Sequence, residues 1–285
     1  MPAALVVERV ITGRFLGASL EAPFGIARSP LDQYYLTDAE ANRIIRLDAE
    51  FEAVDDIGGF GFGVGQFNSP GFCHLDNGGN LWVSDDDNRR VVRLDARLNF
   101  VDELRLYDTD SLSDFGQPSG VAASDYGDLW VADRTGDRIA VFDNVLNFDR
   151  LIGDYGYSSG QLTSPEKILV ESNGDFLVCD AGAARLVRYD QYGNYRGEVK
   201  LGNYVYPIAA AKDGDRLWVV DHHGATLLCL DGKGKVVFST GPQLIGDNTR
   251  LREPTDLVLL PDDRLLVVDS GNARLLLCRI VVDQP

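Results

Sequence analysis

The chain has 285 residues, 45 % of them hydrophobic, and its 27 basic and 44 acidic residues give a formal net charge of −17. So negative a surface repels phosphate groups, which excludes nucleic acid and anionic membrane surfaces as expected partners. No apolar run approaches the ~20 residues of a membrane-spanning helix, and residues 1–15 lack the basic start and long apolar segment of a secretory signal.

The first predicted element is a strand over residues 4–13, which begins with the run ALVVERV. A unit that repeats six times follows it. Each unit begins near a proline and carries an Asp 14 or 15 residues later. The prolines are Pro23, Pro70, Pro118, Pro165, Pro207 and Pro254, and the aspartates are Asp38, Asp85, Asp133, Asp180, Asp221 and Asp269. Two markers that keep one period along the whole chain indicate a repeat protein.

The third unit shows the pattern most clearly. In LWVADRTGDRIAVFD (129–143) two runs of β-branched and aromatic residues flank a polar turn, which is typical of a β-hairpin. The run after Pro118 and the run NFDRLIG supply two further strands. A unit of roughly 40 to 50 residues suits one four-stranded blade. The sequence therefore predicts an all-β, six-bladed β-propeller with four antiparallel strands per blade, as one domain over residues 1–285.

The sixth unit has no fourth strand after RLLLCRIVV, so strand 4–13 is expected to complete the last blade. Four cysteines, Cys73, Cys179, Cys229 and Cys278, fall in predicted strands of four different blades. Buried free thiols are the favoured interpretation. With no secretory signal found, these thiols predict a reducing, cytoplasmic location.

Residues 65–95 and 38–48 resemble the repeats of the NHL family of six-bladed β-propellers. They share a Gly-rich lead-in, a proline, a short inner strand and a hairpin of the form D-x-x-N-x-R-[IV]-x-x-[FL]-D. The resemblance implies the propeller fold but indicates little about activity, since propellers host unrelated functions. The hairpin Asp and the Arg five residues later are expected to pair, and Trp82, Trp130 and Trp218 share one repeat position. Repetition marks all of these residues as scaffold.

Few side chains that could act in catalysis or bind a metal are expected in the central channel. Amidating-lyase relatives of the family carry zinc-binding histidines directly after several repeat prolines, and this chain has none there. His74 lies in an inner strand, and His222 and His223 are expected on a peripheral turn, so a zinc site is not predicted. No catalytic residue and no cofactor is assigned.

A less favoured alternative is a calcium-dependent, gluconolactonase-like hydrolase. That resemblance implies that Glu166 and Asp256 hold the ion, with Ser119 or Thr255 adding a hydroxyl, although the Asn ligand of those enzymes is missing. A salt bridge of Lys167 with Glu166 or Asp256 is the competing interpretation.

The turns between second and third strands and the inter-blade loops should share one face, here called the upper face. Aromatic residues gather there: Phe60, Phe62, Phe67, Tyr107, Phe115, Tyr155, Tyr157, Tyr204 and Tyr206. Interleaved with acids, they suit a basic protein or a polyhydroxylated ligand, or they seal the gaps between blades.

Blades four and five depart from the repeat. Asp180 and Pro207 are 27 residues apart, where the other units take 32 or 33, and Thr226 replaces the hairpin Arg. A binding face is predicted over Tyr155, Tyr157, Tyr204, Tyr206, Asp221, His222 and His223, with an eroded repeat as the alternative. The predicted function is a non-catalytic interaction scaffold that binds a protein partner within a larger assembly.

Overall fold

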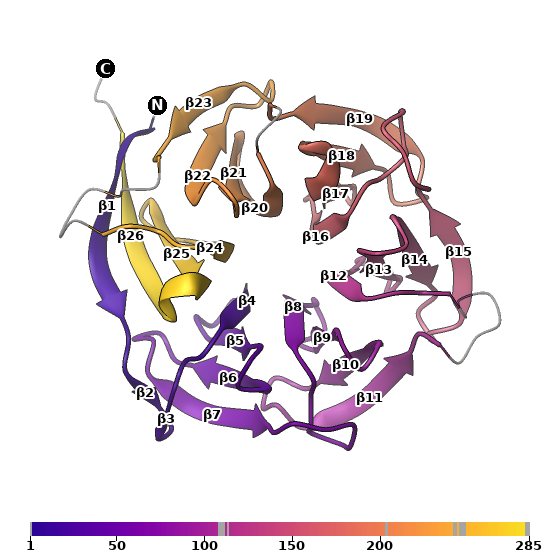
Figure 1. The fold of residues 1–285 in the computed structure, drawn as a ribbon, viewed down its shortest axis with the longest axis horizontal. Coiled ribbons are helices and arrows are strands. Elements are labelled where there is room, and N and C mark those ends of the chain that lie inside the picture. Colours follow the sequence, from indigo (N-terminus) through magenta and orange to yellow (C-terminus); the bar gives the residue numbers. More distant parts are fainter. Residues whose placement is uncertain are drawn as a thin grey trace.

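The computed structural model describes residues 2–107, 112, 114–202, 205–241, 244 and 249–282. It is a six-bladed β-propeller in which every blade is a four-stranded antiparallel sheet, as predicted (Figure 1). Among the residues described, helical structure is limited to short 3-10 turns such as η2 (Ala181–Ala183) and η3 (Ser270–Asn272). Within the described residues, no helix has the length and apolarity to cross a bilayer.

The strands follow the repeat in chain order. Blade one contains β4 (Pro23–Arg28), β5 (Tyr34–Asp38), β6 (Arg43–Leu47) and β7 (Ala53–Gly58), and blade two contains β8 (Pro70–Leu75), β9 (Leu81–Asp85), β10 (Arg90–Leu94) and β11 (Phe100–Arg105). Blade three contains β12 (Pro118–Ala123), β13 (Leu129–Asp133), β14 (Arg138–Phe142) and β15 (Phe148–Ile152), and blade four contains β16 (Pro165–Val170), β17 (Phe176–Asp180), β18 (Arg185–Tyr189) and β19 (Tyr195–Lys200). Blade five contains β20 (Pro207–Asp213), β21 (Arg216–Asp221), β22 (Thr226–Leu230) and β23 (Val236–Ser239). Blade six contains β24 (Pro254–Leu260), β25 (Arg264–Asp269), β26 (Arg274–Val282) and the N-terminal strand β1 (Pro2–Ile11).

The N-terminal strand closes the ring. Strand β1 pairs antiparallel with β26 along its whole length, from Pro2 opposite Val282 to Ile11 opposite Leu275 (Figure 1). The strand ends at Ile11 rather than at residue 13, because Gly13 has a φ of 116°. Strands β2 (Arg14–Phe15) and β3 (Ala18–Ser19) then form a small hairpin that the sequence did not predict.

The hairpin Asp and Arg pair as predicted in the five blades that have both. The ion-pair distances are 3.6 Å for Asp38–Arg43, 2.7 Å for Asp85–Arg90, 3.2 Å for Asp133–Arg138, 2.7 Å for Asp180–Arg185 and 2.6 Å for Asp269–Arg274. All five aspartates are fully buried, so each charge needs its partner.

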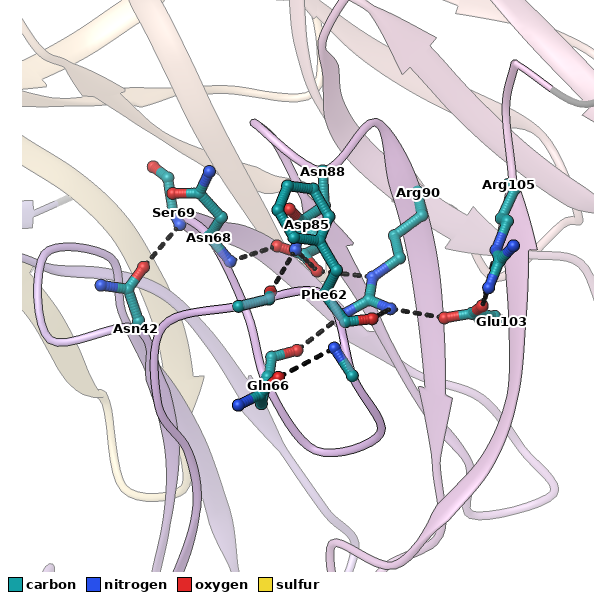
Figure 2. Close-up of polar contacts among 12 residues, drawn as sticks. Asn42, Phe62, Gln66, Asn68, Ser69, Asp85, Asn88, Arg90, Glu103 and Arg105 are labelled. Atoms are coloured by element: carbon teal, nitrogen blue, oxygen red, sulfur yellow. Dashed lines mark hydrogen bonds and ion pairs between the residues drawn. The ribbon is translucent and has the colours of Figure 1, made fainter.

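Blade two shows what this pair holds in place (Figure 2). Asp85 accepts a hydrogen bond of 2.7 Å from the backbone N–H of Asn68, two residues before the repeat proline. Arg90 donates to the carbonyl groups of Phe62 and Gln66 in the inter-blade loop. The pair therefore fastens the loop to the hairpin beneath it, which is a structural role.

The core consists of hydrophobic clusters between neighbouring blades. Trp130 of blade three stacks on Phe176 of blade four with ring centroids 3.7 Å apart, and Trp82 and Trp218 are buried too. Packing between blades thus explains the repeated tryptophan. All four cysteines are buried and free. Phe67 and Phe115 are also fully buried, so these two loop aromatics seal the blades and do not belong to the exposed upper face.

Candidate binding site at the upper mouth of the channel

An ion pair and two aromatic rings close the central channel. Lys167 on β16 reaches across to Asp256 on β24, with 2.5 Å between Nζ and Oδ1. The rings of Phe24 and Phe72 meet edge to face at 5.0 Å, and the Lys167 ammonium lies 6.0 Å from the Phe72 ring. Asp256 and Phe72 are fully buried and the Lys167 side chain is only 13 % exposed, so together these side chains fill the channel at this level. Lys167, Asp256, Phe24 and Phe72 are called the channel plug below.

Above the plug, four blades contribute one side chain each to a polar cluster. Arg134 lies at its centre, with its Nε atom 3.0 Å from Oε1 of Glu166 and its Nη2 atom 3.4 Å from Oδ2 of Asp86. The hydroxyl of Tyr206 donates to the same Oε1 atom of Glu166 at 3.3 Å. Asp86, Arg134, Glu166 and Tyr206 are called the mouth cluster below.

The repeat explains how these residues meet. Asp86 and Arg134 each follow the hairpin Asp of their blade, Glu166 follows a repeat proline, and Tyr206 precedes one. All of these positions lie at the upper ends of inner strands or turns, so the ring gathers them around its axis. Sequence reasoning counted Asp86 only among the acids interleaved with the upper-face aromatics, and it missed Arg134, although both directly follow the repeat Asp of their blade.

The two carboxylates of the mouth cluster are electrostatically unusual. Burial raises the pKa of Asp86 to about 7 and that of Glu166 to about 7, and the nearby Arg134 guanidinium only partly opposes the shift. Oδ1 of Asp86 and Oε2 of Glu166 are buried and have no hydrogen-bond partner within the described residues. One guanidinium therefore serves two buried carboxyl groups and leaves an oxygen of each unbonded.

Aromatic rings border the cluster on blade five. Tyr206 stacks on His223 with ring centroids 4.2 Å apart. His222 lies next to them, and its Nδ1 atom is 3.0 Å from the carbonyl oxygen of Pro254, at the start of an inner strand. The predicted turn is confirmed, because His222 and His223 lie between β21 and β22, but His222 is not peripheral, since it reaches Pro254 of the neighbouring blade.

The other predicted binding residues separate into three groups. Tyr155 and Tyr157 are exposed and touch each other, with centroids 6.3 Å apart, on the loop between β15 and β16. Asp221 is buried and accepts the backbone N–H groups of Tyr206 and Gly224, so it stabilises its turn. In the described part of the chain no cation pairs with it, in keeping with Thr226 in the Arg position. Tyr204 lies outside the described residues.

The candidate calcium ligands do not converge. Glu166 is paired with Arg134 above the plug, and Asp256 is paired with Lys167 within it. The hydroxyl groups of Ser119 and Thr255 donate to backbone carbonyl groups. No group of three or more metal-binding His, Cys, Asp or Glu side chains occurs among the described residues. These residues do not fit a calcium centre, and the salt bridge of Lys167 with Asp256 is the alternative that the structure contains.

No protein-family model and no curated protein matches this chain. Several solved structures, however, align with most of this chain. Virginiamycin B lyase from Staphylococcus aureus aligns at 17 % identity and a TM-score of 0.68, over 93 % of this chain and 83 % of that one. A structural genomics protein of unknown function from Bacteroides thetaiotaomicron aligns at 13 % identity and a TM-score of 0.69, over 96 % and 73 %. A chain of a nidogen/laminin complex aligns at 20 % identity and a TM-score of 0.65, over 84 % and 86 %. At these identities the likeness concerns the propeller fold.

Proposed function

We propose that this propeller is a non-catalytic interaction scaffold whose upper channel mouth binds a cationic side chain, Lys or Arg, of a partner protein. The observation that carries the proposal is the pair of unbonded, buried oxygens on Asp86 and Glu166. A buried polar atom without a partner costs roughly 1–3 kcal/mol, so a ligand that supplies the missing hydrogen bond gains that energy. A side chain with N–H donors and a positive charge supplies the missing hydrogen bonds and also offsets the negative charge of the two carboxylates.

The surroundings of the mouth cluster favour the same ligand. With both acids ionised, the cluster has one positive and two negative groups, and the whole chain has a net charge of −17. Such a field attracts basic segments and speeds their encounter. The stacked rings of Tyr206 and His223 add an aromatic border, and aromatic faces contact cations favourably. The fold itself supports a scaffold role only by analogy, through the propeller in the nidogen/laminin complex.

One observation favours a second candidate, an enzyme that transfers protons. Carboxyl groups with a pKa of about 7, as in Asp86 and Glu166, suit general acid–base catalysis at neutral pH. Virginiamycin B lyase, which aligns with this chain, is an example of an enzyme with a similar propeller fold. The scaffold is preferred because Glu166 already holds both Arg134 and Tyr206.

Fluorescence anisotropy with short labelled peptides tests the proposal. Peptides with one central Arg or Lys are expected to bind, whereas peptides with citrulline or acetyl-lysine at that position should bind at least ~10-fold more weakly, because truncating one partner of a buried charge pair costs 2–5 kcal/mol. Glu166→Gln and Asp86→Asn should weaken the cationic peptides to a similar extent. Asp262→Asn, a change of the same charge at a side chain that is 85 % exposed, is the control. Equal affinity for charged and neutral peptides would contradict the proposal.

A further inference from the structure

Below the plug the channel opens into a cavity that the mouth cluster does not touch. Its first part has a volume of about 420 Å³ and is lined by the lower halves of inner strands β4, β8, β16, β20 and β24. A second part of about 560 Å³ continues toward the lower face. The two parts share His74, Leu75, Leu169, Val170 and Lys212, so they form one space. Volumes of this size are typical of small-molecule sites.

The buried end of this cavity is the ammonium group of Lys167. An ammonium has three N–H donors, and in the described residues the hydrogen bond found for it goes to Oδ1 of Asp256. Asp256 is itself well bonded, because it also accepts the N–H groups of Ile26 and Leu257. The Lys167 side chain is 13 % exposed and lines the cavity, so it has donors left for an acceptor there.

The wall of the first part is about equally polar and apolar. Leu75, Leu169, Ala211 and Leu259 supply apolar surface, and Arg28, Ser29 and Lys212 are among the polar residues. Apolar surface next to a cationic donor at the closed end suits a molecule that has an acidic head and a short hydrocarbon body.

Charges near the open end are compatible with an anion. Glu171 pairs with both Lys212 and Arg188, so two cations share one carboxylate there. Asp125 also lines the outer part, but it is exposed to solvent and accepts from the amide of Asn77. His74 adds no positive charge at neutral pH, because burial and the nearby Lys167 lower its pKa to about 4.

We propose that the lower channel cavity binds a small monocarboxylate with an apolar body, whose carboxylate accepts hydrogen bonds from Nζ of Lys167. The ligand enters from the lower face, since the plug closes the other end. This site is separate from the mouth cluster and does not depend on the function proposed for it.

Isothermal titration calorimetry with hexanoate, octanoate and decanoate, and with the alcohols of the same length, tests the proposal. The carboxylates are expected to bind with 1:1 stoichiometry and at least ~10-fold more tightly than the alcohols, because the charged hydrogen bond to Lys167 is lost in an alcohol. The double variant Lys167→Met/Asp256→Asn removes the ammonium without leaving a buried charge alone, and it should remove the preference for carboxylate.

A second variant keeps the test independent of the ion pair. Ala211→Phe adds a ring to the cavity wall and should abolish binding of decanoate, while Lys167 and Asp256 remain in place. Undiminished binding in Ala211→Phe would locate the ligand elsewhere and overturn the proposal. So would equal affinity for decanoate and decanol, or absence of binding by every carboxylate of the series.

Discussion

Lys167 and Asp256 form an ion pair across the centre of the ring, with 2.5 Å between Nζ and Oδ1, although they are 89 positions apart and belong to blades four and six. Both side chains come from inner strands, and Asp256 is fully buried. The pair joins two blades that are not sequence neighbours, and it divides the channel into an upper mouth and a lower cavity. Both sites proposed for this protein exist as separate places because of it.

The ion pair makes a prediction about stability. Lys167→Met leaves the Asp256 carboxylate buried and uncompensated, so it should lower the free energy of unfolding by roughly 3–5 kcal/mol. The double variant Lys167→Met/Asp256→Asn should recover most of that loss, since no lone charge remains. Urea unfolding of the three proteins measures both effects. A double variant as unstable as the single one would show that packing, rather than charge, sets the cost.

The mouth cluster makes a prediction about pH. The pKa values of Asp86 and Glu166 are both raised to about 7 from 3.8 and 4.5, so the folded protein keeps protons that the unfolded chain has released. Stability from these groups is present below about pH 4 and is lost as the pH rises through about 7. The melting temperature of Asp86→Asn/Glu166→Gln should therefore fall less between pH 5 and pH 8 than that of the parent.

The control for that experiment is Asp262→Asn, at an exposed side chain on the lower face. It should leave the pH dependence of the parent unchanged. If the double variant keeps the full loss of stability between pH 5 and pH 8, the two acids do not titrate in this range.

His74 makes a prediction with the opposite sign. Burial and the charge of Lys167 lower its pKa to about 4 from 6.5, so the unfolded chain binds the proton first. The stability that His74 contributes is present above pH 6.5 and is lost as the pH falls toward 4. NMR titration of the imidazole should give a midpoint near 4, and a higher midpoint in Lys167→Met/Asp256→Asn. A midpoint near 6.5 in the parent would contradict the buried, neutral state.

The closing strand makes a prediction about solubility. Deletion of residues 1–13 removes β1 and exposes the edge of β26, which can then pair with other chains. The shortened protein should melt at a lower temperature and elute from size-exclusion chromatography as aggregates. Arg9→Gln, which removes only exposed contacts of Arg9 with the Glu50 carbonyl and the Glu52 carboxylate, is the control and should behave like the parent. A soluble monomer with an unchanged melting temperature after the deletion would argue against closure by this strand.

The sequence by itself determined the ring and its internal scaffold. The spacing of 14 or 15 residues between repeat Pro and Asp, as from Pro118 to Asp133, recurs in six units. It reports contacts within one blade and its loop, which involve residues fewer than 50 positions apart. For the same reason the Asp–Arg pairs and the buried tryptophans were predictable. The closing strand was predictable for another reason, since the sixth repeat lacks a fourth strand and residues 4–13 belong to no repeat. The break at Gly13 and the β2–β3 hairpin were not, because they belong to no repeat.

The tertiary structure alone decided which side chains meet around the axis. Asp86, Arg134, Glu166 and Tyr206 come from four blades. Their repeat positions place them at the upper mouth, but only the closed ring decides which of them contact one another. Lys167 stands beside Glu166 in the chain but pairs with Asp256, since successive side chains of a strand point in opposite directions. The ring brings the inner strands of all six blades to one centre. The partner of each charged residue there therefore depends on the direction and length of its side chain, and the spacing of repeats in the sequence does not specify these.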